Sequence, residues 1–139
     1  MNQTAIFWPM LALMGWTFLV LVQVPIRRFR AAFAGRVEAI DFQCGESDRV
    51  PPDVALPNRL FMNLVEVPVL FYTVCVIFFV TNRVDATVVG LAWLYFGLRM
   101  VHSFIYLTYN HVVHRFFVFA VSNLVVVALL IYLAAALAR

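Results

Sequence analysis

Residues 59–80 read RLFMNLVEVPVLFYTVCVIFFV, an apolar run with three strongly polar side chains near its start. A helix needs about 20 apolar residues to cross a hydrocarbon core of about 30 Å, and this run is long enough. Similar runs lie at residues 5–24, 87–108 and 116–138. The sequence therefore predicts four membrane-spanning helices, at about residues 5–26, 59–81, 86–109 and 114–138.

Composition predicts the same class of protein. Hydrophobic residues make up 65% of the chain and charged residues only 12%, which is too little polar surface for a water-soluble globule of this size. A chain of 139 residues accommodates one helical bundle, so we expect a single domain over residues 1–139. The short connections between the later runs require antiparallel neighbours. The predicted fold is an all-α integral membrane protein, an antiparallel four-helix transmembrane bundle.

Charge indicates how the bundle is oriented. Arginines crowd the connection over residues 27–58, where several carboxylates also lie. By the positive-inside rule this loop is expected in the cytoplasm and both termini in the periplasm. Because the loop contains both basic and acidic residues, we interpret the net charge of +3 as an indication of how the helices are oriented in the membrane. We expect no nucleic-acid partner.

Polar side chains recur inside the predicted spans at spacings of three and four residues, which place them on one face of each helix. Such residues are costly in a bilayer, so they are expected to face a shared interior. Glu66 and Arg99 reach similar depths in the membrane, and we expect an ion pair between them. The polar residues are Arg59, Asn63, Glu66, Arg99, His102, Tyr106 and Arg115.

Two interpretations of these side chains stay open from the residues alone. In the first, the ion pair is a structural lock that fixes helix register, and the arginines near helix ends extend to lipid head groups. In the second, Arg59, Arg99 and Arg115 outnumber Glu66 and form a positively charged cavity that attracts an anion. The first interpretation predicts a scaffold, and the second predicts a binding site.

Two blocks of this sequence resemble one family of membrane proteins, the membrane-associated proteins in eicosanoid and glutathione metabolism (MAPEG). The block RLFMNLVEVP at residues 59–68 is similar to the family's second-helix motif of Arg, Asn and Glu followed by Pro. The block from Arg99 to Tyr106, followed by Arg115, is similar to the prostaglandin synthase branch. Residues 63–72 also resemble a bacterial branch, which implies a bacterial inner membrane.

The resemblance implies a site and an assembly. Members form homotrimers with sites between neighbouring subunits, and they use glutathione as a co-substrate. By this resemblance Arg115 is the catalytic residue that stabilises the glutathione thiolate. The implied glutathione-binding residues are Arg59, Asn63, Glu66, Arg99, His102 and Tyr106, together with Arg28 or its neighbour Arg27.

The implied chemistry is physically sound, because a thiol is nucleophilic only as the thiolate and a guanidinium group is always charged. A crevice open to lipid admits an apolar acceptor molecule. We therefore expect a glutathione-dependent membrane transferase or peroxidase that joins the thiolate to a hydrophobic electrophile. The alternative is a non-catalytic membrane bundle that acts as an accessory subunit or a lipid-binding protein.

Some positions depart from the family's pattern. Phe116 and Phe119 stand where the prostaglandin branch has hydroxyl groups, and His102 replaces the tyrosine of the leukotriene branch, so neither specific activity is expected. No metal site is expected either, because no carboxylate or cysteine completes a ligand set with the histidines. Cys44 and Cys75 lie in the loop and in an apolar helix, which gives no disulfide, and no role for Cys44 follows from the sequence.

Overall fold

The computed structural model describes residues 2–138, and every regular element in that range is helical. Four helical segments there are long and apolar enough to cross a membrane: Gln3–Phe33, Pro52–Val80, Ala86–Leu107 and Val112–Leu137. The protein is therefore an integral membrane protein, and the predicted all-α bundle is confirmed. The elements are η1 (Gln3–Ile6), α1 (Phe7–Phe33), η2 (Ala39–Phe42), α2 (Pro52–Glu66), α3 (Pro68–Val80), α4 (Ala86–Leu107) and α5 (Val112–Leu137).

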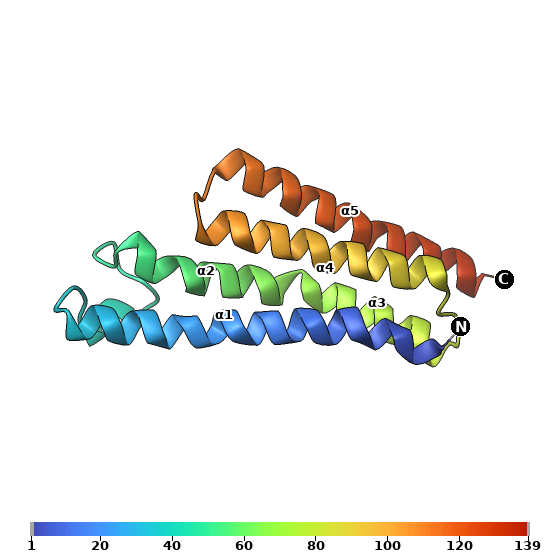
Figure 1. Ribbon diagram of the computed structural model, residues 1–139, viewed down its shortest axis with the longest axis horizontal. Helices are drawn as coiled ribbons and strands as arrows, with labels where there is room; N and C mark the ends of the chain where they lie inside the picture. The colour runs from blue at the N-terminus through green and yellow to red at the C-terminus, as the bar shows by residue number, and fades with distance from the viewer. Residues whose placement is uncertain (1, 139) are drawn as a thin grey trace.

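The helices lie side by side along one long axis and alternate in direction (Figure 1). The chain ends and the turn at residues 81–85 lie at one end of the bundle, which we call the terminal end. The loop at residues 34–51 and the turn at residues 108–111 lie at the opposite end, which we call the loop end. At the loop end, α1 and α2 project beyond the turn that joins α4 to α5.

The first helix is longer than the sequence predicted. α1 continues to Phe33 instead of ending near residue 26, and Pro25 lies inside it. The missing N–H of Pro25 removes one backbone hydrogen bond, which a membrane helix tolerates. At 1.5 Å per residue, a helix of 27 residues is about 40 Å long and exceeds a hydrocarbon core of about 30 Å. The last turns of α1, with Arg27 and Arg28, therefore extend past that core.

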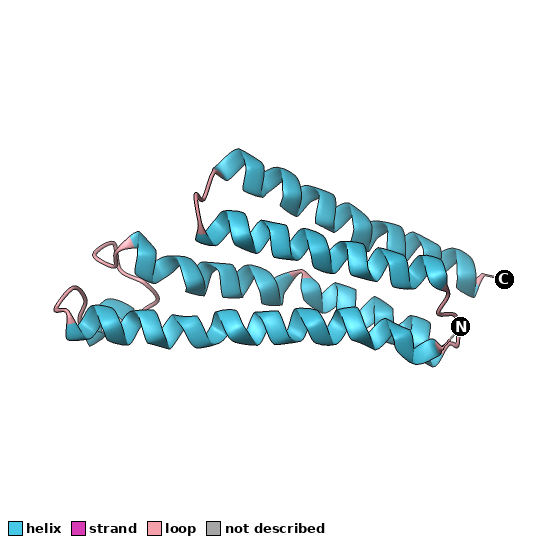
Figure 2. Cartoon of the chain, in the orientation of Figure 1, coloured by secondary structure: helices cyan, strands magenta, loops and turns pink. Residues whose placement is uncertain are grey.

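The second predicted span begins early and is interrupted. α2 begins at Pro52 instead of near residue 59, because proline at the first helical position is favourable. α2 ends at Glu66 and α3 begins at Pro68, since Pro68 has no N–H with which to continue the backbone ladder; Figure 2 shows the break. The last carbonyl groups of α2 are therefore open to other donors.

Hydrogen bonds fix the loop between α1 and α2. Asp41 accepts from the backbone N–H of Glu38 at 2.9 Å and from the Ser47 hydroxyl at 2.8 Å, and these bonds hold the pKa of Asp41 below its ordinary value. Arg36 donates to the two carboxylate oxygens of Asp53, on the first turn of α2, at 2.8 and 3.2 Å. This pairing raises the pKa of Arg36 above its ordinary value. The loop is therefore anchored to α2.

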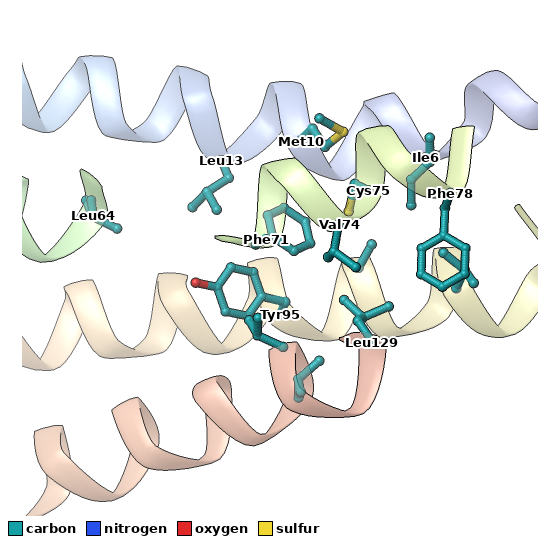
Figure 3. Packing of buried hydrophobic residues seen from close by; sticks show 14 of the residues in the cluster. Ile6, Met10, Leu13, Leu64, Phe71, Val74, Cys75, Phe78, Tyr95 and Leu129 are labelled. Atoms are coloured by element: carbon teal, nitrogen blue, oxygen red, sulfur yellow. The ribbon is translucent and has the colours of Figure 1, made fainter. Parts of the chain in front are cut away.

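Apolar side chains fill the interior of the bundle toward the terminal end (Figure 3). Phe71, Phe78, Tyr95 and Leu129 are fully buried. The rings of Phe71 and Tyr95 stack with their centroids 4.4 Å apart, which joins α3 to α4. Close packing of this kind drives association of membrane helices, because lipid tails are as apolar as the side chains.

Polar contacts close the terminal end around that core. Gln3 and the backbone of Val84 exchange two hydrogen bonds, at 3.1 and 3.0 Å. Asp85 caps α4 by accepting the backbone N–H of Val88 at 2.9 Å, a favourable arrangement at a helix N-terminus. Arg83 donates to a carbonyl oxygen near the end of α5, where a cation is also favourable. The terminal end thus pairs its polar groups with one another.

Candidate functional site

A pocket of about 190 Å³ opens between α2, α4 and α5 in the half of the bundle nearer the loop end. It brings together four of the residues that the sequence singled out, which come from three separate helices. The remaining walls are apolar. The lining residues are Asn63, His102, Tyr106, Val112, Arg115, Phe116 and Phe119.

Arg115 is held in this pocket by two contacts. Its Nη1 donates to the side-chain oxygen of Asn110 at 2.8 Å. Its guanidinium carbon lies 4.3 Å from the centre of the Tyr106 ring, a cation–π distance. Asn110 has a φ of 45°, which the tight turn between α4 and α5 requires and which asparagine tolerates better than most residues. Because no carboxylate in residues 2–138 pairs with Arg115, its charge is available to an anion.

Arg99 lies inside the bundle next to the pocket, and its side chain is fully buried. Its Nη2 donates to the carbonyl oxygen of Asn63, in the last turn of α2. A cation at a helix C-terminus is favoured by the helix dipole. The other two nitrogens, Nε and Nη1, have no hydrogen-bond partner among the described residues. Its guanidinium carbon lies 5.5 Å from the centre of the Phe119 ring, and no carboxylate in the described part of the chain pairs with it. Arg99 therefore adds a second positive charge next to the pocket.

The predicted ion pair between Glu66 and Arg99 is wrong for this chain taken alone. Glu66 is exposed, and no salt bridge in residues 2–138 includes it. The physical reason is the break at Pro68, because it leaves carbonyl groups at the end of α2 that satisfy Arg99 in place of a carboxylate. The prediction treated residues 59–81 as one unbroken helix and missed these acceptors.

His102 lies close to Arg99 on α4 and is almost fully buried, with 2% of its surface exposed. Its ring centre is 5.8 Å from that of Tyr106 and 5.8 Å from that of Phe119. Within residues 2–138 its Nδ1 has no hydrogen-bond partner. A buried polar atom without a partner is unfavourable unless a water or a ligand satisfies it, so this imidazole is available for a ligand.

Arg28 and Arg59 do not line the pocket; they meet around a carboxylate that the sequence did not single out. The Nη2 of Arg28 lies 3.2 Å from Oε1 of Glu46, and the Nε of Arg59 lies 3.7 Å from Oε2 of the same residue. Glu46 belongs to the irregular loop, so no helical spacing related it to either arginine. Only the distance in space, which the sequence does not give, could have identified it.

Asn110 connects Arg59 to the pocket. Together with Arg59 it lines a second cavity of about 140 Å³, at the start of α2. The same Asn110 side chain binds Arg115 of the first pocket, and the Asn63 side chain, which lines the first pocket, donates to the carbonyl oxygen of Arg59 at 2.9 Å. No helical spacing relates Asn110 to the other polar residues, although asparagine is a typical residue of so short a turn.

Comparison with known proteins supports one relationship. The family model described as the MAPEG family matches residues 6–135 of the chain. Comparisons with curated proteins and with solved structures gave no match. The matched range includes all four apolar helical segments except a few residues at the outer ends of the first and the last. On that match, which covers most of the sequence, the chain belongs to the MAPEG family.

Proposed function

We propose that the protein is a glutathione-dependent membrane transferase or peroxidase, in which Arg115 stabilises the glutathione thiolate. One observation carries this proposal: Arg115 is oriented by Asn110 and Tyr106 in a pocket where it has no carboxylate partner in the described part of the chain. Glutathione is generally associated with the MAPEG family to which the chain belongs. An uncompensated guanidinium group favours an anion, and the thiolate is the reactive anion of glutathione.

The chemistry follows from the walls of the pocket. The thiol loses its proton to water, and the thiolate remains beside the Arg115 guanidinium group. Phe116 is 69% exposed at the mouth of the pocket, so an apolar molecule dissolved in the bilayer can approach the sulfur. In a transferase the sulfur bonds to an electrophilic carbon of that molecule. In a substitution a leaving group departs from that carbon with the bonding electrons, and in an addition the electron pair of the opened double bond or epoxide takes up a proton from water. In a peroxidase it attacks the terminal oxygen of a hydroperoxide, the O–O bond breaks, and the departing alkoxide takes up a proton and leaves as the alcohol. A second glutathione then attacks the sulfenic acid so formed, which gives glutathione disulfide and releases water.

A neighbouring subunit completes the site in this proposal. Typical ligand sites have volumes of about 300–1,000 Å³, and the pocket of one chain has only about 190 Å³. Glu66 and Arg59 are exposed on α2, where a second copy can contact them. We infer a homotrimer in which Arg28, Arg59, Asn63, Glu66, Arg99, His102 and Tyr106 bind glutathione. The homotrimer lies in the bacterial inner membrane, with the loop end in the cytoplasm.

The second candidate function is a non-catalytic bundle that acts as an accessory subunit or a lipid-binding protein. One observation favours it: Glu46 already pairs with both Arg28 and Arg59, which reduces the positive charge available for a ligand. The two candidates differ in whether Arg115 binds and ionises glutathione.

The decisive experiment is glutathione binding to the detergent-purified protein by calorimetry, together with ultraviolet absorbance of the thiolate. We expect binding with a thiolate signal, and Arg115→Ala should lose that signal and lower kcat by about 10²- to 10³-fold, as removal of one charge-stabilising donor does. Arg30→Ala is the matched control, because Arg30 is an exposed arginine at the loop end of α1. No glutathione binding by the wild type would favour the non-catalytic bundle, whereas an unchanged thiolate signal in Arg115→Ala would mean that another group ionises the thiol.

A further inference from the structure

We propose that Glu46 sets the affinity of the site, as an internal carboxylate that competes with the ligand for Arg28 and Arg59. This inference rests on the function proposed above, in which both arginines belong to the anion-binding site. It adds a residue from the loop to that site and gives it an opposing role.

The contacts of Glu46 are those of a bound carboxylate ligand. Each carboxylate oxygen faces one guanidinium group, Oε1 that of Arg28 on α1 and Oε2 that of Arg59 on α2. Only 9% of the Glu46 side chain is exposed. Arginine is the preferred partner for carboxylates because its planar fork matches their geometry. Glutathione presents two carboxylates of the same chemistry, so the two arginines form a carboxylate site that Glu46 already occupies.

Glu46 is a weak occupant of that site. Strong pairs between a guanidinium group and a carboxylate have distances of about 2.7–2.9 Å, whereas the two distances here are 3.2 and 3.7 Å. The side chains of Arg28 and Arg59 are 31% and 64% exposed, so solvent weakens both contacts even though the Glu46 side chain is largely buried. A free carboxylate that reaches optimal geometry can therefore displace Glu46.

The loop can release Glu46 without losing its own structure. The bonds of Asp41 to Glu38 and Ser47 do not include Glu46. Gly45, which precedes Glu46, has a φ of 96°, a conformation that glycine adopts freely. Arg28 also keeps a second contact, because its guanidinium carbon lies 4.5 Å from the centre of the Phe42 ring. The arginine thus stays oriented after the carboxylate leaves.

Competition of this kind has a predictable size. When a site is free for only a fraction of the time, the apparent dissociation constant rises by the inverse of that fraction. If Glu46 occupies the arginines for roughly nine-tenths of the time, its removal lowers the Kd about tenfold. Because both distances exceed those of strong pairs, we expect removal of Glu46 to raise the affinity by roughly three- to tenfold. The same residue in a purely structural role would give no gain in affinity when it is removed.

The test compares Glu46→Gln, which keeps the shape and removes the charge, with the wild type. Calorimetry on the detergent-purified full chain measures the Kd for glutathione and for glutarate, a dicarboxylate with no thiol. We expect Glu46→Gln to bind roughly three- to tenfold more tightly. Asp48→Asn is the matched control, since Asp48 is an exposed carboxylate of the same loop, and its Kd should stay within about twofold of the wild-type value.

The outcomes separate this inference from the proposed function. If the wild type binds glutathione and Glu46→Gln binds it no more tightly, the inference is overturned and the function stands. If neither protein binds glutathione but Glu46→Gln gains affinity for glutarate, the function is wrong and the inference stands. If Glu46→Gln gains affinity for neither glutathione nor glutarate, the inference is overturned. Glu46→Asp, whose side chain is one methylene shorter and keeps the charge, must show a smaller gain than Glu46→Gln, and thermal unfolding without ligand verifies that both variants fold.

Discussion

The two ends of the bundle differ in whether their polar groups have hydrogen-bond partners within the chain. At the terminal end, Gln3 pairs with the backbone of Val84, and Arg83 and Asp85 satisfy the ends of two helices. Toward the loop end, Arg99 and His102 are buried with polar atoms that have no partner in residues 2–138. The first end is closed by hydrogen bonds within the chain, and the second has donors left over. In the core between them the hydroxyl of Tyr95 also has no partner among the described residues.

This difference indicates which end serves stability and which serves function. A buried donor without a partner costs free energy that a satisfied one does not. Such groups cluster at binding sites, where a ligand satisfies them. The same end contains the pocket with Arg115. Under the proposed function the terminal end serves stability and the loop end serves ligand binding, and variants at the two ends should differ accordingly.

The largest expected effect is on stability and comes from the terminal core. Phe78 is fully buried and its ring centre lies 6.0 Å from that of Tyr132. Replacement of a buried phenylalanine by alanine leaves a cavity and costs about 3–5 kcal/mol. We expect Phe78→Ala to lower the free energy of unfolding in detergent by that amount. The glutathione affinity of the folded fraction should stay within about twofold of the wild-type value. A much larger loss of affinity would contradict the view that the terminal end serves stability alone.

Arg99→Met should have the opposite effect to Phe78→Ala, because it should weaken glutathione binding without lowering stability. Methionine is also unbranched and is two atoms shorter than arginine, and the substitution removes a buried charge with two unpaired nitrogens. Replacement of a complete buried ion pair by apolar groups is often neutral or stabilising by about 1–4 kcal/mol, and Arg99 has no carboxylate partner among the described residues that its removal would leave unpaired. We expect an unchanged or higher melting temperature together with a Kd for glutathione that rises about tenfold, equivalent to 1.4 kcal/mol. Thermal unfolding and calorimetry measure the two effects, and a large loss of stability would show that Arg99 is a structural lock.

Much of this fold could be predicted from the sequence, because length and hydrophobicity alone determine which segments cross a membrane. The spacing of Asn63, His102 and Tyr106 also placed them on inward faces, and all three line the pocket. These are local properties of a helix. They depend on the period of the α-helix and not on which helices become neighbours.

The missed features depend on the neighbours of each residue in space. Pro68 breaks the second span, and no hydropathy pattern indicates that Arg99 then uses a backbone carbonyl in place of Glu66. Glu46 lies in an irregular loop, so its two arginine partners follow from the packing of that loop. Asn110 acts through the turn geometry of the folded chain. Side-chain pairing between elements is therefore the part that the sequence did not predict.

A smaller effect is expected at the cap of α4 on the terminal end. Asp85 accepts hydrogen bonds from the backbone N–H of Val88 and from the hydroxyl of Tyr132. These hydrogen bonds, that of Tyr132 first, hold the pKa of Asp85 below its ordinary value. Loss of a helix cap costs about 1 kcal/mol. We expect Asp85→Ala to lower the free energy of unfolding by about that much, as measured by thermal unfolding in detergent. Thr87→Ala, an exposed residue on the same turn, is the control and should have little effect.

The smallest effect lies in the loop and depends on pH. Hydrogen bonds to the Asp41 carboxylate, first that of the Glu38 N–H and then that of the Ser47 hydroxyl, hold its pKa below the ordinary 3.8. Because the folded loop favours the charged form, this contribution is complete above the ordinary pKa and is lost as the pH falls through the lowered value. Asp41→Asn should therefore speed amide exchange in residues 38–50 at neutral pH and change it little in strong acid. Exchange rates, each normalised to the intrinsic rate at that pH, measure the difference. An equal difference at both pH values would mean that Asp41 acts through its shape and not its charge. Exchange in α5 should not respond at either pH, since the loop is anchored to α2 through Arg36 and Asp53.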